Sequence, residues 1–190
     1  MISRKLIPFL LLSAVTANAA VNVNWTSAGN AIKQDDGTTN APSTWYAQLI
    51  WSSDNSISAL NPMSPFVPTD GEVVLKEQSL NGFNAAGFLS GGTVDATGLV
   101  PGDGIGGYVY TRVFNVLYSV APSTPTFYGN SVAVSGPLAA DIIAPPTPMT
   151  TSHAPVVTVN QRIVAIPEPS TYALAAVGIA AALWRRRRKA

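Results

Sequence analysis

A few acidic side chains could do chemistry in this 190-residue chain. Asp35 and Asp36 are adjacent and Asp54 precedes an asparagine, so both stretches offer the oxygen ligands that calcium prefers. Neither stretch has the spacing of an EF-hand loop, and Asp in turns usually bonds its own backbone. We expect no cofactor, and calcium at Asp35, Asp36 and Asp54 is the weaker alternative.

Other catalytic arrangements have little support in the sequence. His153 is the only histidine and lies in a proline-rich segment, so we expect an exposed loop side chain. No serine has the G-x-S-x-G context of a nucleophile elbow, and without cysteine there is no thiol chemistry. The G-x-G-x-x-G pattern at 102–107 precedes a strand rather than a helix, so we interpret it as a loop. We expect no catalytic residues and no enzyme, and glycoside hydrolysis by paired carboxylates is the remaining enzymatic hypothesis.

The C-terminal segment, residues 166–190, combines three features in a fixed order: a proline-flanked acid, an apolar run at 172–184 and a basic end. The motif around the proline-flanked acid consists of Pro167, Glu168, Pro169, Ser170 and Thr171. The basic end consists of Arg185, Arg186, Arg187, Arg188 and Lys189. A helix over the apolar run would be about 20 Å long, which is short for a hydrocarbon core of ~30 Å. Long basic side chains that reach the interface and local thinning of the bilayer compensate for the short length of this helix. We therefore expect a single, weakly held transmembrane helix whose basic end is a cytoplasmic stop.

This order of features resembles a PEP-CTERM protein-sorting tail. The resemblance implies an exported protein of a Gram-negative bacterium, often one that makes extracellular polysaccharide. It also implies a protease partner, exosortase, that recognises Pro167-Glu168-Pro169 and cuts at a bond the motif does not define. The same tail is sometimes labelled as an ice-binding protein C-terminal domain, but the body has no regular Thr-x-Thr ladder.

The N-terminus is typical of a secretory signal peptide over residues 1–19. Two basic residues precede an apolar stretch, and Ala17 and Ala19 form an A-x-A cleavage site. The partners implied are the Sec translocon and signal peptidase. The expected route leads to the inner membrane, which holds the C-terminal helix with the body in the periplasm, and then to the cell surface or extracellular matrix.

Charge and composition limit the role of the body. Seven of the 11 Lys and Arg lie at the two ends, which leaves a mildly acidic body between them. Nucleic acid is therefore not an expected partner. With 11% charged residues, the polar surface must come from Ser, Thr, Asn, Gln and Gly, a bias common in exported β proteins.

The body, residues 20–140, contains strand-length runs separated by turn residues. Alternation or β-branched and aromatic residues predict strands at 44–51, 72–76, 88–89 with 93–94, 108–118, 127–134 and 155–165. Turns are expected at four dipeptides: Asp36-Gly37, Asp70-Gly71, Asn81-Gly82 and Gly91-Gly92. The fold class is thus all-β, an antiparallel β-sandwich, with a small barrel as the alternative.

The proline-rich segment, residues 141–165, is either a stalk or a long loop before a last strand. The order of strands and turns also resembles small uncharacterised PEP-CTERM β proteins, which carry no activity that could be transferred.

Aromatic residues and one arginine complete the candidates in the body. Trp25, Trp45 and Trp51 are expected in the core, and tyrosines 46, 108 and 110 on a solvent face, where they could stack on sugars. Arg112 is expected to be a paired or edge charge. The body is therefore expected to be a non-enzymatic surface or matrix protein, alternatively a carbohydrate- or calcium-binding module. The sequence does not determine its ligand or oligomeric state.

Overall fold

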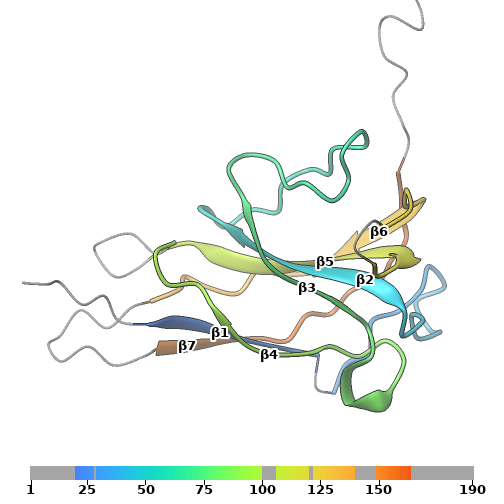
Figure 1. Ribbon diagram of the computed structural model, residues 1–190, viewed down its shortest axis with the longest axis horizontal. Coiled ribbons are helices and arrows are strands. Elements are labelled where there is room, and N and C mark those ends of the chain that lie inside the picture. The colour runs from blue at the N-terminus through green and yellow to red at the C-terminus, as the bar shows by residue number, and fades with distance from the viewer. Residues whose placement is uncertain (1–19, 28, 100–105, 120–121, 140–148, 164–190) are drawn as a thin grey trace, which may run out of the picture.

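The computed structural model describes residues 20–27, 29–99, 106–119, 122–139 and 149–163. This part of the chain is mostly β, with two sheets and one short 3-10 turn, Gly82–Asn84. The smaller sheet has the order β4-β1-β7 and the larger one β3-β2-β5-β6-β8 (Figure 1). The strands are β1 Val21–Thr26, β2 Trp45–Ser52, β3 Val73–Ser79, β4 Ser90–Asp95, β5 Tyr108–Leu117, β6 Phe127–Asn130, β7 Met149–His153 and β8 Gln161–Arg162.

The two sheets face each other and enclose one apolar core (Figure 1). Trp25 enters it from β1, Leu49 from β2 and Val113 from β5. Each of these strands alternates apolar side chains toward the core, as the period-2 geometry of a strand requires. At one side of the molecule, Lys76 Nζ of β3 donates a hydrogen bond of 2.6 Å to the carbonyl oxygen of Gly91 in β4, which links the edges of the two sheets.

The strongest strand predictions are confirmed. β2, β3 and β5 occupy the expected segments to within a few residues, and β4 and β6 overlap theirs. The expected strand at 155–165 is reduced to isolated bridges at Val157 and Thr158 and the two residues of β8. β1 and β7 were not predicted, although β1 alternates buried and half-buried residues along its length.

One strand pair differs from the antiparallel arrangement expected. β1 pairs with β7 in parallel, in the register Val21 with Met149 through Trp25 with His153, and all other named pairs are antiparallel. Parallel pairing needs a long connection, and here nearly the whole body lies between the two strands. Residues 149–153 of the proline-rich segment are therefore part of the smaller sheet.

The turn expected at Gly91-Gly92 is wrong, because both residues lie inside β4. Gly91 is needed for close packing instead. A Cβ at this position would lie 2.5 Å from Cε3 of Trp25, so only glycine lets the indole approach the strand. The adjacent irregularity in the β1–β4 register, between Trp25 and Thr26, fits the same crowding.

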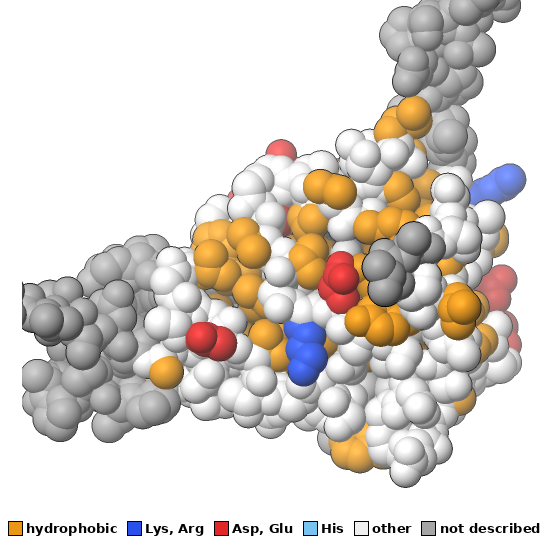
Figure 2. Space-filling model, viewed as in Figure 1, with side chains coloured by type: hydrophobic (Ala, Val, Ile, Leu, Met, Phe, Trp, Pro, Cys, Tyr) orange, Lys and Arg blue, Asp and Glu red, His pale blue; other side chains and the backbone are white. Residues whose placement is uncertain are grey.

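The loop between β2 and β3, residues 53–72, covers part of the outer face of the larger sheet, on the side away from the smaller sheet (Figure 1). We call it the cover loop. Phe66 packs against Phe114 of β5, with the two ring centroids 4.9 Å apart. The surface in Figure 2 carries few and scattered charged side chains, with hydrophobic side chains gathered between them.

The expected signal peptide, with Ala17 and Ala19, and the C-terminal segment with the apolar run at 172–184 lie outside the described residues. Within the part that is described, no helix is long and apolar enough to span a membrane.

Candidate functional site

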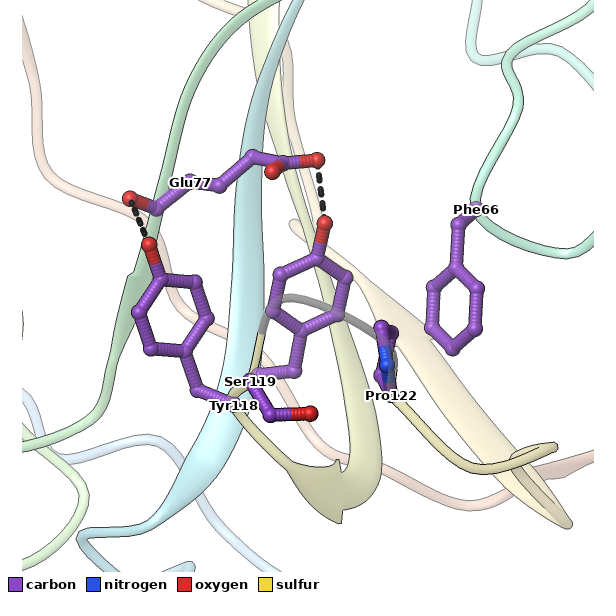
Figure 3. Close-up of a pocket in the computed structure, with 6 residues that line it drawn as sticks. Phe66, Glu77, Tyr118, Ser119 and Pro122 are labelled. Carbon is purple, nitrogen blue, oxygen red and sulfur yellow. Dashed lines mark hydrogen bonds between the residues drawn. The ribbon is translucent and has the colours of Figure 1, made fainter.

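A hollow of about 560 Å³ opens beside the cover loop, on the outer side of the larger sheet. Its volume is within the range of ~300–1,000 Å³ that small-molecule sites occupy. Figure 3 shows Glu77 at one end, Phe66 and Pro122 along one side, and Tyr118 and Ser119 on the other. Tyr46 is the sixth lining residue.

Glu77 is an exposed carboxylate held in place by buried side chains. The hydroxyl of Tyr46 donates a hydrogen bond to Glu77 Oε1, and Gln48 Nε2 donates to the same oxygen over 3.0 Å. Burial and the bond to Glu77 both raise the pKa of Tyr46, so its hydroxyl keeps its proton and acts as a donor. Two donors on one oxygen fix the direction in which the carboxylate points.

Strand register explains this meeting of residues. Gln48 of β2 lies opposite Glu77 of β3, and paired residues project from the same face of a sheet. Tyr46 is two residues before Gln48 and therefore shares that face. The amide of Gln48 also donates to the carbonyl oxygen of Phe66 over 2.9 Å, so the same side chain fixes the cover loop.

Aromatic rings form the walls of the hollow. The ring of Tyr118 is stacked on that of Tyr46, with centroids 5.5 Å apart and an interplanar angle of 20°. Phe66 approaches Tyr46 edge-on at 5.2 Å. Tyr118 is 42% exposed, whereas Tyr46 is 3% exposed, so Tyr118 is the ring that offers its surface to a ligand.

The solvent-face prediction is wrong for Tyr46 and Tyr110, and the cover loop is the reason. Tyr110 is fully buried, and its hydroxyl donates to Glu72 Oε2 of the cover loop over 2.7 Å. Tyr108 is half-buried. The sequence predicted correctly which side chains share the outer face of the larger sheet. The cover loop packs on that face, however, so these side chains contact its hydrophobic side chains and backbone carbonyl groups instead of solvent.

The core prediction for tryptophan is confirmed. Trp25 is fully buried, and Trp45 and Trp51 are partly buried against the same core. Trp51 Nε1 is nevertheless buried without a hydrogen-bond partner among the described residues. Gly107, which ends the glycine-rich stretch at 102–107, packs against that nitrogen, and a Cβ there would be 2.1 Å away. Residues 102–105 of the stretch lie outside the described part of the chain.

Arg112 is neither an edge charge nor an ion-paired one in the part of the chain described. It is 1% exposed, in β5 at the centre of the larger sheet. Its Nη2 donates to the Ser58 carbonyl oxygen over 2.6 Å and its Nε to Asn130 Oδ1 over 2.8 Å. The guanidinium also lies 5.4 Å from the ring centroid of Tyr110 and 5.8 Å from that of Tyr128. Hydrogen bonds and aromatic faces thus hold the charge.

The prediction for His153 is also wrong: the side chain is buried rather than exposed in a loop. The indole Nε1 of Trp25 donates to Thr111 Oγ1 over 2.9 Å, and the same hydroxyl lies 2.9 Å from His153 Nε2. The hydroxyl has one proton and two lone pairs, so besides accepting from the indole it can either donate to Nε2 or accept from it, according to the ring tautomer. His153 Nδ1 lies 2.8 Å from Ser135 Oγ, so each ring nitrogen has a hydroxyl partner.

This histidine predicts a pH dependence of stability. Burial lowers the pKa of His153 to about 4 from 6.5, so the unfolded chain binds the proton more strongly than the folded one. Its contribution is complete above the unfolded pKa and declines as the pH falls toward the folded pKa. We expect the free energy of unfolding to drop by about 2 kcal/mol between pH 7 and pH 5 in urea titrations.

The His153→Gln variant provides the control for that measurement. It lacks the titrating group, so its stability, although lower at pH 7, should change little over the same interval. Asp36 has a depressed pKa of about 2, caused first by its bond from the Thr39 side chain and then by backbone bonds, and it titrates below this window. An equal pH slope in both proteins would contradict the assignment.

Two of the acidic residues considered as calcium ligands, Asp36 and Asp54, accept hydrogen bonds within their own loops instead. Asp36 Oδ1 accepts the backbone N–H groups of Thr38 and Thr39 at 2.8 Å each. Asp54 Oδ1 accepts hydrogen bonds from the side chains of Ser56 and Ser52, and these bonds lower its pKa. Asp35 is exposed beside Asp36. Across the described residues there is no cluster of three or more His, Cys, Asp or Glu that could hold a metal ion.

One comparison identifies a function-bearing part of the chain. The family described as PEP-CTERM protein-sorting motif matches residues 165–188. The chain carries a PEP-CTERM sorting motif. Its position agrees with the resemblance drawn from Pro167, Glu168 and Pro169 and the basic end. No curated protein and no solved structure matches the chain.

The PEP-CTERM motif implies export, a cell-surface or extracellular location and exosortase as the processing partner. Its residues lie outside the described part of the chain. The described part ends at Ile163, which packs beside Phe114 and Tyr46 on the outer face of the larger sheet. The described structure thus extends to two residues before the matched segment begins.

The Glu77 hollow was not predicted from the sequence. Its residues come from β2, β3, the cover loop and the segment after β5, and only the β2–β3 register brings Glu77 to Tyr46. A signal was present in the alternation of β2, which placed Tyr46 and Gln48 on one face. No signal in the sequence indicated which acid would meet them.

Proposed function

We propose that this chain is a non-enzymatic surface or extracellular-matrix protein of a Gram-negative bacterium, sorted by exosortase. The match of the PEP-CTERM motif to residues 165–188 carries the proposal. In this scheme the Sec translocon exports the chain, signal peptidase cuts after Ala19, and the helix at 172–184 anchors it in the inner membrane. The body, an all-β sandwich, is periplasmic until exosortase releases it to the surface or the exopolysaccharide.

The proposal predicts where the protein accumulates when sorting fails. In cells lacking exosortase, we expect the full-length chain to stay in the inner-membrane fraction, and in wild-type cells a shorter body to be recovered outside. The reason is that only cleavage near Pro167-Glu168-Pro169 separates the body from its anchor. Immunoblots of cell fractions, with mass spectrometry of both termini of the released form, measure this outcome.

A matched pair of variants sharpens the test. Glu168→Ala changes the centre of the motif and should block release, whereas Glu72→Ala, in the cover loop, should leave release intact. Unchanged release from exosortase-deficient cells or from the Glu168→Ala variant would contradict the sorting proposal.

A second candidate for the body is a carbohydrate-binding module. It is supported by the Glu77 hollow, which combines an exposed carboxylate with aromatic walls. Glycan-array screening of the mature protein tests it, and an array with no saccharide bound would leave the structural role alone.

A further inference from the structure

The Glu77 carboxylate is preorganised to accept hydrogen bonds from a ligand. Its Oε1 already accepts two hydrogen bonds, from Tyr46 and from Gln48, and both donors are at least nine-tenths buried. No described residue donates to Oε2. A carboxylate oxygen can accept two hydrogen bonds, so within the described part of the chain Oε2 keeps its full accepting capacity, and the bonds to Oε1 set its position. Fixing a polar group by buried partners is how binding sites reduce the cost of ordering it.

The charge of the hollow restricts what it can bind. Among the described residues, Glu77 is the one charged residue in its lining, and the other lining residues are aromatic or neutral: Tyr46, Phe66, Tyr118, Ser119 and Pro122. An anionic group would meet like charge at Glu77 without a cation in the lining to offset it. Neutral hydroxyl groups and amino groups can instead donate to the carboxylate.

The walls suit a ring with a flat apolar face. Tyr118 offers the more exposed surface, and its stacking on Tyr46 fixes the orientation of its ring. Phe66 stands at an interplanar angle of 75° to Tyr46, which makes a corner rather than a flat platform. A sugar ring has C–H groups on its faces and hydroxyl groups at its edge, so it can contact the aromatic rings and Glu77 together.

We infer that the hollow lined by Tyr46, Phe66, Glu77 and Tyr118 binds a neutral or amino-bearing saccharide residue. Glu77 accepts hydrogen bonds from hydroxyl or amino groups, and Tyr118 and Phe66 cover the ring. This inference deepens the carbohydrate-binding candidate above and rests on it. Of the three tyrosines that the sequence suggested for stacking on sugars, Tyr46, Tyr108 and Tyr110, only Tyr46 lines this hollow.

Isothermal titration calorimetry on the full-length protein in detergent tests the site with three probes: a glucose tetramer, an N-acetylglucosamine tetramer and a galacturonate tetramer. We expect saturable binding of a neutral probe and at least about tenfold weaker binding of the uronate, since charged hydrogen bonds contribute ~1.5–3 kcal/mol. Glu77→Gln removes the charge and should weaken binding about tenfold or more. Tyr118→Ala should do the same, whereas Tyr118→Phe, which keeps the ring, should bind within about twofold.

Glu72→Gln is the matched control, because Glu72 accepts a hydrogen bond from Tyr110 as Glu77 does from Tyr46, but outside the hollow. The Glu72→Gln variant should lower thermal stability about as much as Glu77→Gln does, and it should leave saccharide binding unchanged. The inference is overturned if no probe binds, if the galacturonate tetramer binds best, or if tetramethylammonium displaces the sugar and binds more tightly. Binding that Glu77→Gln leaves intact would also overturn it. Release by exosortase is measured separately, so a failed titration with normal release contradicts only the saccharide site.

Discussion

Replacing Trp25 with alanine is expected to lower the free energy of unfolding by about 3–5 kcal/mol, a large part of the ~5–15 kcal/mol that stabilises a typical domain. Trp25 is fully buried at the centre of the smaller sheet and packs against the backbone of Gly91. The truncation leaves a cavity that a closely packed sheet cannot fill. It also removes the hydrogen bond from the indole to the Thr111 hydroxyl, which is in turn paired with His153 Nε2.

Urea unfolding of three variants separates these effects. Trp25→Phe keeps much of the volume but loses the Nε1–H group, so its loss should be smaller than that of Trp25→Ala. Val132→Ala removes an exposed side chain and should stay within about 0.5 kcal/mol of the wild type. If Trp25→Ala behaved like Val132→Ala, the packing of the two sheets described above would be incorrect.

Removing the Arg112 side chain should lower the free energy of unfolding about as much as Trp25→Ala does. Arg112→Ala is expected to cost about 3 kcal/mol, because a fully buried side chain is lost and two half-buried acceptors, the Ser58 carbonyl and Asn130 Oδ1, lose their donors at ~1 kcal/mol or more each. The apolar stem of the side chain also leaves a space between Tyr110 and Tyr128. The cover loop loses one of its attachments to the sheet.

Arg162→Ala is the control for charge, since Arg162 is exposed in β8 and its loss should change stability by less than about 0.5 kcal/mol. Arg112→Met, which restores the apolar volume without the donors, should lie between the two. Thermal and urea unfolding measure the order of the three variants. If Arg112→Ala left the free energy of unfolding unchanged, the guanidinium would contribute nothing to holding the cover loop.

The strands of the larger sheet could be predicted because their composition and alternation are local. β5 is dense in aromatic and β-branched residues, and β2 shows its two faces directly in the sequence. β7 has the composition Met-Thr-Thr-Ser-His inside a proline-rich segment, and it becomes a strand only because β1 offers it an edge. Such a pairing depends on residues far apart in the chain, so no local pattern indicates it.

The environment of polar side chains was harder to predict than the strands. Tyr46 and Tyr110 were placed on the correct face of the larger sheet, but the cover loop buries that face, and His153 was expected in solvent because its neighbours are prolines and small polar residues. A loop that crosses a sheet carries no periodicity. Its carbonyl groups at Ser58 and Phe66 satisfy buried donors that the sequence alone presents as surface residues.

The parallel pairing of β1 with β7 has a consequence for folding during export. β1 begins at Val21, at the start of the body, while its partner β7 begins at Met149. A chain that crosses a membrane from its N-terminus delivers β1 early and β7 late, so β1 must wait with one edge unpaired until almost all of the body has crossed. Contacts of such high sequence separation make folding slow and leave strand edges open to aggregation. The smaller sheet is therefore complete only when β7 has joined β1, after nearly the whole body has been delivered.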